Sequence, residues 1–414
     1  MYRPILGLAV LVLAYPIDVA IDAGPVRTAL YAVLIATLLL VWIHRQLTNR
    51  AGPWQATALN LPVVVFAGTT LVSLAGQGGQ IQQQIVGLLQ ALAAFVVFFL
   101  VIQSLRSPGD LWLLLGAVLV AGLLQATATD LQLVLGRPIG ESSIVLTFDE
   151  RATTFASYLV LIAPFLIALG LAFRRRWPSV CAGLALVILS VALFATQSRA
   201  GWFALITATL AIALLLPGRR LRLAGLAIAV ISVLLVVGLG TPILARLGPQ
   251  ALLMIEWRRD IWIATLAMMR EHAIFGVGVG DFHNFYPFYS LHLASYDQSQ
   301  NLFLNIAAER GILGLIAFWA MLAVLVKTLA KAVAAAGTTL NRAVPAGLIA
   351  SFTAFLVHAQ FEAPYGDFSV ELLFWLLVGV AASLPYLIQS QSPTSGLGNS
   401  PSNSIASRTT PVSA

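Results

Sequence analysis

The side chains best suited to chemistry in this sequence are arginines that stand apart from its main basic clusters. Arg199 lies in the stretch TQSRAGWF, and Arg258 and Arg259 lie in EWRRDIW. A guanidinium is permanently charged, and its fork of N–H donors matches the oxygens of a phosphate. A lone arginine serves equally well as an interfacial anchor, or pairs with a carboxylate such as Glu256 or Asp260. Several arginines gathered at one cavity would instead favour phosphate binding.

A second polar stretch, SQNLFLNIAAERGILG, begins at Ser299. We expect Ser299 to cap the helix that follows, because serine is one of the residues preferred at that position. Gln300, Asn301 and Asn305 then add polar groups near the start of the same helix. This stretch is the second source of side chains that could contact a substrate.

Glycines lie close to both of these polar stretches. The stretch HAIFGVGVGDF holds Gly276, Gly278 and Gly280. No strand precedes these glycines and no Walker lysine follows them, so a nucleotide loop is disfavoured. A tight turn that returns the chain toward the membrane is the better interpretation. Farther along, Gly311 and Gly314 predict a helix face that packs closely against a neighbour.

The composition shows which solvent surrounds these residues. Of the 414 residues 59% are hydrophobic and only 9% are charged, and the mean hydropathy is +0.92. Too few charges are present to coat a soluble particle of this size. Hydrocarbon offers backbone N–H and C=O groups no partner, and the apolar runs lack the strict alternation of a barrel strand. The fold class is therefore an all-α integral membrane protein.

Apolar stretches near or above the roughly 20 residues that cross a bilayer recur along the chain. They predict twelve transmembrane helices, at 4–22, 26–43, 57–75, 85–103, 111–129, 153–173, 178–196, 200–217, 222–240, 301–326, 343–360 and 369–388. A cytoplasmic N-terminus places the basic clusters Arg174–Arg176 and Arg219–Arg222 on the inner side, as the positive-inside bias requires. We expect both termini in the cytoplasm. The net charge of +7 then reflects topology and gives no reason to propose nucleic-acid binding.

The segment 241–300 is far longer than the other connections, and long structured loops usually carry function. It contains MIEWRRDIWIATLAMMREH, which we interpret as a helix at the outer interface. Five apolar residues predict one face of this helix, namely Ile255, Ile261, Trp262, Leu266 and Met269.

The domain organisation is simple. Residues 1–388 form one polytopic transmembrane domain, and the tail at 389–414 is rich in Ser, Pro, Gly, Asn and Thr. A tail of that composition buries no core and is expected to be disordered and cytoplasmic. Cys181, the only cysteine, falls within a predicted span, so neither an intramolecular disulfide nor a thiolate metal cluster can form.

The order of three segments carries a resemblance. SRAGWFAL, RRDIWIATLAMMREHAIFGVGVGDF and QNLFLNIAAERGILG resemble the O-antigen ligase and O-antigen polymerase superfamily, including its signature loop and the helix that follows. The resemblance is specific over residues 180–318, and FEAPYGDFSVELLFWLLVGVA near the end also fits. The N-terminal half matches only in hydropathy.

The resemblance implies a GT-C-like glycosyltransferase of the bacterial inner membrane with a periplasmic active site. It would take a glycan from an undecaprenyl-diphosphate carrier, with inversion and without a metal or other cofactor. The acceptor would be lipid A-core in a ligase, or the growing glycan in a polymerase. The family's two arginines fall on Arg199 and Arg258, with Arg259 as the alternative, and would bind the diphosphate and stabilise the leaving group. We expect a monomer whose further partner is membrane lipid.

One departure concerns the base. Ligases carry a histidine, the proposed general base, where this chain has Gln300. A glutamine orients an acceptor hydroxyl but accepts no proton near neutral pH. The candidate bases are His292, His283, Asp297 and Glu309, although for each single histidine a structural role is the stronger prior. The residues assigned to substrate binding are Arg259, Asn301, Arg151, His292 and Glu309, where Arg151 of FDERATTF has pairing with Asp149 or Glu150 as its simpler account.

Two other functions compete with glycosyl transfer. A membrane solute transporter also uses about twelve helices and buried polar groups, and some relatives have been labelled bicarbonate transporters. A transporter places charges or broken helices near the bilayer midplane, whereas the charges here concentrate at helix ends. A relative that binds lipid-linked glycan without catalysis is the third hypothesis, and Gln300 favours it.

Overall fold

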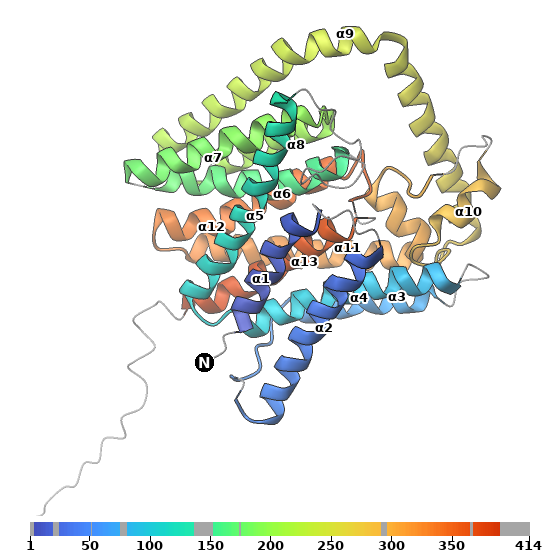
Figure 1. Ribbon diagram of the computed structural model, residues 1–414, viewed down its shortest axis with the longest axis horizontal. Helices are drawn as coiled ribbons and strands as arrows, with labels where there is room; N and C mark the ends of the chain where they lie inside the picture. The colour runs from blue at the N-terminus through green and yellow to red at the C-terminus, as the bar shows by residue number, and fades with distance from the viewer. Residues whose placement is uncertain are drawn as a thin grey trace, which may run out of the picture.

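The computed structural model describes residues 4–19, 25–50, 52–74, 81–135, 152–173, 175–290, 296–364 and 367–389. Within these ranges every regular element is a helix (Figure 1). The helices are α1 (Pro4–Val19), α2 (Pro25–Leu47), α3 (Asn60–Ser73), α4 (Ile81–Ser104), α5 (Pro108–Val134), α6 (Ala152–Ala172), α7 (Arg176–Ala195), α8 (Arg199–Leu215), α9 (Arg219–Glu271), α10 (Phe282–Tyr289), α11 (Leu302–Ala335), α12 (Thr339–His358) and α13 (Phe368–Gln389). The predicted all-α class is confirmed.

The chain is a membrane protein by the length and composition of its helices. Eight of the described helices are long and apolar enough to cross a bilayer. Four shorter apolar helices, of 10 to 17 residues, fall where the sequence predicts further spans. The exact number of crossings therefore stays a prediction.

The largest difference from the sequence interpretation is α9. The sequence predicts a span that ends near residue 240 and then a loop, whereas the backbone is helical without a break from Arg219 to Glu271. Figure 1 shows α9 leaving the bundle beside α7 and α8, arching over its top and descending to α10. Helical geometry continues through Gly238, Gly240 and Pro242, although glycine and proline are poor helix formers. The structured loop is thus mostly a continuation of one long helix.

The descending end of α9 buries an apolar face, as predicted, but a somewhat different one. Ile261, Ala264 and Met268 are buried against α10 and α11, at the spacing of one helix face. Leu266 was predicted to share this face and is instead 45% exposed. It lies two positions before Met268, which places it on a different side of the helix. Ser290 ends the packed α10 segment that this face covers.

Aromatic packing holds the start of α13 in place. The fully buried Trp375 is surrounded by Phe66 of α3 and by Phe95 and Phe98 of α4, with ring centroids 4.7 to 6.2 Å apart. Such rings bury large apolar areas and prefer the edge-to-face geometry that two of these pairs show. Glu371, one turn before Trp375, is therefore carried on a rigid element.

Two ends of the bundle can be distinguished. Ser157 near the start of α6, Ser198 just before α8 and His358 at the end of α12 are hydrogen-bonded together, so these helix ends meet. We call this the site end, and the opposite end, where α11 finishes and α12 begins, the basic end. Among residues with described side chains, the basic end holds Arg45, Arg50, Arg106, Arg175, Arg176, Arg219, Arg222, Lys327, Lys331 and Arg342. The site end holds Arg199, Arg258, Arg259, Arg270 and Arg310.

Candidate functional site

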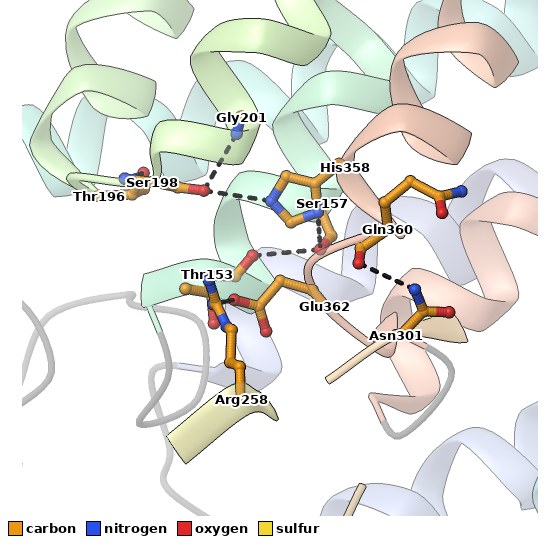
Figure 2. A network of polar contacts seen from close by, with 10 residues as sticks. All are labelled: Thr153, Ser157, Thr196, Ser198, Gly201, Arg258, Asn301, His358, Gln360 and Glu362. Carbon is orange, nitrogen blue, oxygen red and sulfur yellow. Dashed lines mark hydrogen bonds and ion pairs between the residues drawn. The ribbon is translucent and has the colours of Figure 1, made fainter. Parts of the chain in front are cut away.

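A fully buried histidine links three helices at the site end (Figure 2). His358 places Nδ1 3.2 Å from Ser157 Oγ and Nε2 3.2 Å from Ser198 Oγ. Ser157 donates its proton to the Thr153 carbonyl oxygen, so it must accept from Nδ1–H. Ser198 accepts the Gly201 N–H at 3.1 Å and can then donate to Nε2. One neutral tautomer of His358 satisfies every group in this chain of hydrogen bonds.

The same network sets where Arg199 begins α8. Ser198 is the N-cap of the helix, with an extended backbone and a side chain that accepts the Gly201 N–H. Arg199 is the first helical residue and is half-buried. Trp202, one turn on, stacks against Phe194 of α7 with centroids 5.3 Å apart. The start of α8, and with it the backbone of Arg199, is therefore held by a cap, a histidine and a ring stack.

Arg258 reaches this network from the far end of α9. Its Nη2 lies 3.2 Å from Glu362 Oε1, and the side chains are 34% and 13% exposed (Figure 2). Glu362 follows His358 by four residues, so the ion pair ties the end of α9 to the segment that follows α12. A guanidinium carries five N–H donors, of which this ion pair engages only part. The backbone of Arg199 and the side chain of Arg258 thus border the same three-helix network.

Arg259 does not take part in this network. Its side chain is 69% exposed, and its Nη2 contacts Asp260 at 3.4 Å. Consecutive residues of a helix point about 100° apart, so Arg258 and Arg259 cannot face the same network. The ion pair with Glu362 therefore brings Arg258, and not Arg259, to the segment that follows His358.

The start of α11 lies against this site, with a different cap from the one predicted. Asn301, and not Ser299, is the N-cap: its Oδ1 accepts the N–H groups of Phe303 and Leu304 at 3.0 and 3.1 Å. Its Nδ2 donates to the Gln360 carbonyl oxygen at 3.0 Å. Ser299 instead donates to the Asn301 carbonyl oxygen at 2.7 Å. Serine and asparagine are both good caps, so the sequence alone did not decide between them.

Gln300 stands between these two residues in a left-handed conformation, with φ of +56°. It is half-buried. Asn, Asp and His adopt this region more readily than other residues that carry a Cβ. A histidine at position 300 would therefore fit the backbone.

The glycine stretch forms the predicted tight turn, and its backbone is hydrogen-bonded to the backbone of α11 at Ala308 and Glu309. Val277 N–H donates to the Ala308 carbonyl oxygen at 2.9 Å and Gly278 N–H to that of Glu309 at 3.0 Å. These carbonyls are available because α11 kinks at Gly311, whose φ is +66°. A Cβ at Gly276 would lie 2.3 Å from the Glu309 backbone carbon, a distance that real Cβ atoms do not show.

A polar cavity of about 390 Å³ opens beside this kink. Its walls come from the start of α4, the turn at 279–283, the segment at 297–298 and the first turns of α11 and α13. The polar side chains that line it are Gln83, Gln90, His283, Asp297, Gln298, Asn305, Glu309, Arg310 and Glu371. Amides and carboxylates of this kind match the donor and acceptor pattern of sugar hydroxyls.

Two ionisable pairs differ in depth within the cavity. Glu309 is 7% exposed and lies 3.7 Å from Arg310. His283 Nδ1 lies 2.8 Å from Asp297 Oδ1, with side chains 45% and 54% exposed. Glu309 is therefore buried beside Arg310, whereas His283 lies where the cavity is accessible.

Further hydrogen bonds fix the segments around the opening of the cavity. Gln84 of α4 donates to the buried Asp281 carboxylate, and Asn284 donates to Asp281 Oδ1 at 2.7 Å. Tyr289 donates to Glu271 at 2.7 Å, and burial together with this bond raises the pKa of Tyr289 to about 12. The turn and α10 are therefore fixed to both α4 and the end of α9.

The sequence interpretation missed much of this site. His358, Ser157, Ser198 and Glu362 were not among the candidates, because nothing in their local sequence marks them. Two predicted residues, Arg151 and His292, lie outside the described residues. Gln300 and Asn301 lie at the start of α11, and Glu309 lies about two turns farther along the same helix.

The comparison with known families gives one match. Residues 184–319 match the family described as O-antigen ligase. The matched segment begins within α7 and ends within α11, beyond the kink at Gly311. It includes Arg199, Arg258, the glycine stretch and Gln300. A search of curated proteins finds no match.

Proposed function

Over residues 184–319 the chain belongs to the O-antigen ligase and polymerase superfamily, and from that premise we propose glycosyl transfer at the site end. The donor is a glycan on an undecaprenyl-diphosphate carrier, and the acceptor is a sugar hydroxyl. The site faces the periplasm. The anomeric carbon is inverted, because one displacement by the acceptor hydroxyl breaks the bond to the diphosphate, which leaves with the bonding electrons.

One observation carries the proposal: the backbone of Arg199 and the side chain of Arg258 border one buried network, next to a polar cavity. Two guanidinium groups at the site end run against the positive-inside distribution, so their placement needs a reason. Fixed donors that point at a developing negative charge lower the barrier to its formation. We assign Arg199 and Arg258 to the diphosphate, with Glu362 as the group that holds Arg258 before the anion binds.

The polar cavity is the proposed acceptor site. Asn301, Asn305 and Glu309 succeed one another at four-residue spacing on α11, so they lie on one side of the helix. That side leads from the Arg258 network to the cavity, over about 12 Å for eight residues at 1.5 Å each. Donor and acceptor would meet near Gln300, which would orient the acceptor hydroxyl.

The proposed base is His283, paired with Asp297. Imidazole is the commonest general base near neutral pH, and a carboxylate bound at Nδ1 fixes the tautomer in which Nε2 accepts a proton. Glu309, which is buried and lies 3.7 Å from Arg310, is better suited to holding a sugar hydroxyl. The hydroxyl proton thus passes to His283 as the new glycosidic bond forms.

The test is reconstitution of the purified protein in liposomes with an undecaprenyl-diphosphate glycan. Two acceptors are supplied separately, lipid A-core and a lipid-linked glycan. Product on lipid A-core identifies a ligase, and longer lipid-linked chains identify a polymerase. Absence of both products in vesicles that accumulate a solute such as bicarbonate would contradict the proposal in favour of transport.

The same assay separates a catalyst from a binder through Gln300→His. If Gln300 only orients the acceptor, the added imidazole leaves transfer unchanged or raises it. Gln197→His is the matched control, because Gln197 has a similar φ of +53° and is exposed. Donor binding without transfer in the wild type, with transfer restored by Gln300→His alone, would show a non-catalytic relative.

A further inference from the structure

Both lysines of this chain line one cavity at the basic end. The chain has 23 lysines and arginines, and only Lys327 and Lys331 are lysines. They lie four residues apart on α11, so their side chains emerge from the same side of the helix. They face a cavity of about 570 Å³ between the ends of α11 and α13 and the residues before α3. This cavity lies at the opposite end of α11 from the proposed glycan site.

The cavity is lined by a few polar side chains and by many apolar ones. Thr328 of α11 and Tyr386 of α13 also line the cavity, but their hydroxyl groups already donate to the carbonyl oxygens of Val324 and Ala56, so the two amines are its main free donors. Alanines, Val324, Pro385 and Ile388 make most of the remaining wall, and none of the described residues that line the cavity carries a carboxylate. Two like charges at this spacing repel each other, and no described residue forms an ion pair with either amine. An anion bound between the amines would remove that repulsion.

We propose that this cavity binds the phosphate headgroup of an anionic phospholipid. The two ammonium groups would hold the phosphodiester, and the apolar wall would take the first carbons of the acyl chains. A lipid fits better than a free phosphate ion, because most of the lining offers a small anion no hydrogen bond. Basic pockets between helices on the cytoplasmic side are the usual sites for such headgroups. The basic end faces that leaflet under the positive-inside bias.

The test is native mass spectrometry of the full-length protein purified in detergent, with short-chain phosphatidylglycerol, phosphatidylcholine or inorganic phosphate added at equal concentration. We expect a one-lipid adduct with phosphatidylglycerol that is at least tenfold more abundant than with phosphatidylcholine. The double variant Lys327→Gln/Lys331→Gln should reduce it about tenfold or more. Arg222→Gln is the matched control, because it removes an exposed charge at the same end and outside the cavity.

A second variant separates a built site from general surface charge. Ala335→Trp fills the cavity at an exposed lining residue and leaves both amines in place. The proposal requires that this variant also lose the adduct and that Lys327→Arg/Lys331→Arg keep most of it. An adduct that survives Ala335→Trp, or falls equally in Arg222→Gln, would overturn the site. An equal adduct with inorganic phosphate would overturn the lipid as its occupant. No outcome depends on glycan transfer.

Discussion

At the scale of single residues, the most informative group is His358. It carries no charge in the assigned tautomer, and it bonds serines that are 201 and 160 residues away in the chain. Its contribution is to hold the start of α8, and therefore Arg199, against α6 and α12. His358 is a positioning residue, because it is buried and cannot touch a substrate.

Ser198→Ala tests this positioning role. The change removes both the helix cap and the bond to His358, so we predict a loss of about 1–2 kcal/mol in stability. A small displacement of Arg199 should lower the rate of transfer by about 10-fold to 100-fold, with little change in KM. Thermal unfolding in detergent and steady-state transfer kinetics measure the two effects.

Two further serine variants serve as controls for Ser198→Ala. Ser198→Thr should recover most of the activity, because threonine is also a good cap. Ser351→Ala in α12 should change stability little, because the Ser351 hydroxyl is buried without a hydrogen-bond partner in the described structure. A Ser198→Ala enzyme with normal rates would show that the network does not position Arg199.

At the scale of elements, the contact between the glycine turn and the kink of α11 shapes the cavity. Gly276 has φ of +75°, and Gly311 approaches the Ile274 carbonyl oxygen too closely for any Cβ. The turn therefore replaces hydrogen bonds that the kinked helix cannot make within itself.

Gly276→Ala should destabilise the protein by about 1–3 kcal/mol through backbone strain alone, and by more because of the clash with Glu309. Gly116→Ala in α5 is the control, since its Cβ would meet nothing within 4 Å. We predict that the control is neutral or gains about 0.5–1 kcal/mol. Unfolding midpoints of the two variants against wild type provide the measurement, and equal midpoints for Gly276→Ala and wild type would contradict the packing described.

The helices were largely predictable from the sequence, because apolar runs of bilayer length admit little else. The continuation of α9 beyond position 240 was not predictable, because glycine and proline near that position locally favour the end of a helix. Only the path of the chain in Figure 1 shows that the helix continues. The arginines of the site could be found, because they defy the charge bias. His358 and Glu362 could not, since their partners lie 100 or more residues away and no local pattern identifies them.

At the scale of the whole molecule, the described basic residues divide unequally between the two ends. The basic end carries the clusters, while the site end carries the arginines assigned to chemistry. This division predicts that the site end faces the periplasm.

Cysteine labelling in intact cells tests the orientation. In a Cys181→Ser background, Arg259→Cys at the site end should react with a membrane-impermeant maleimide, because that position is exposed. Arg222→Cys, exposed at the basic end, should react only after the cells are opened. The reverse pattern would place the proposed site in the cytoplasm and rule out a periplasmic glycan.

The most direct measurement is single-turnover transfer from an undecaprenyl-diphosphate glycan by Arg199→Ala, Arg258→Ala and Arg259→Ala, each checked for folding and membrane insertion. The account predicts that the first two variants lose at least about 100-fold in rate, as removal of a group that stabilises the leaving charge should cause. Arg259→Ala, which changes only the exposed neighbour, should stay within about threefold of wild type. Wild-type rates in both Arg199→Ala and Arg258→Ala, or equal losses in all three, would contradict a diphosphate site built on Arg199 and Arg258.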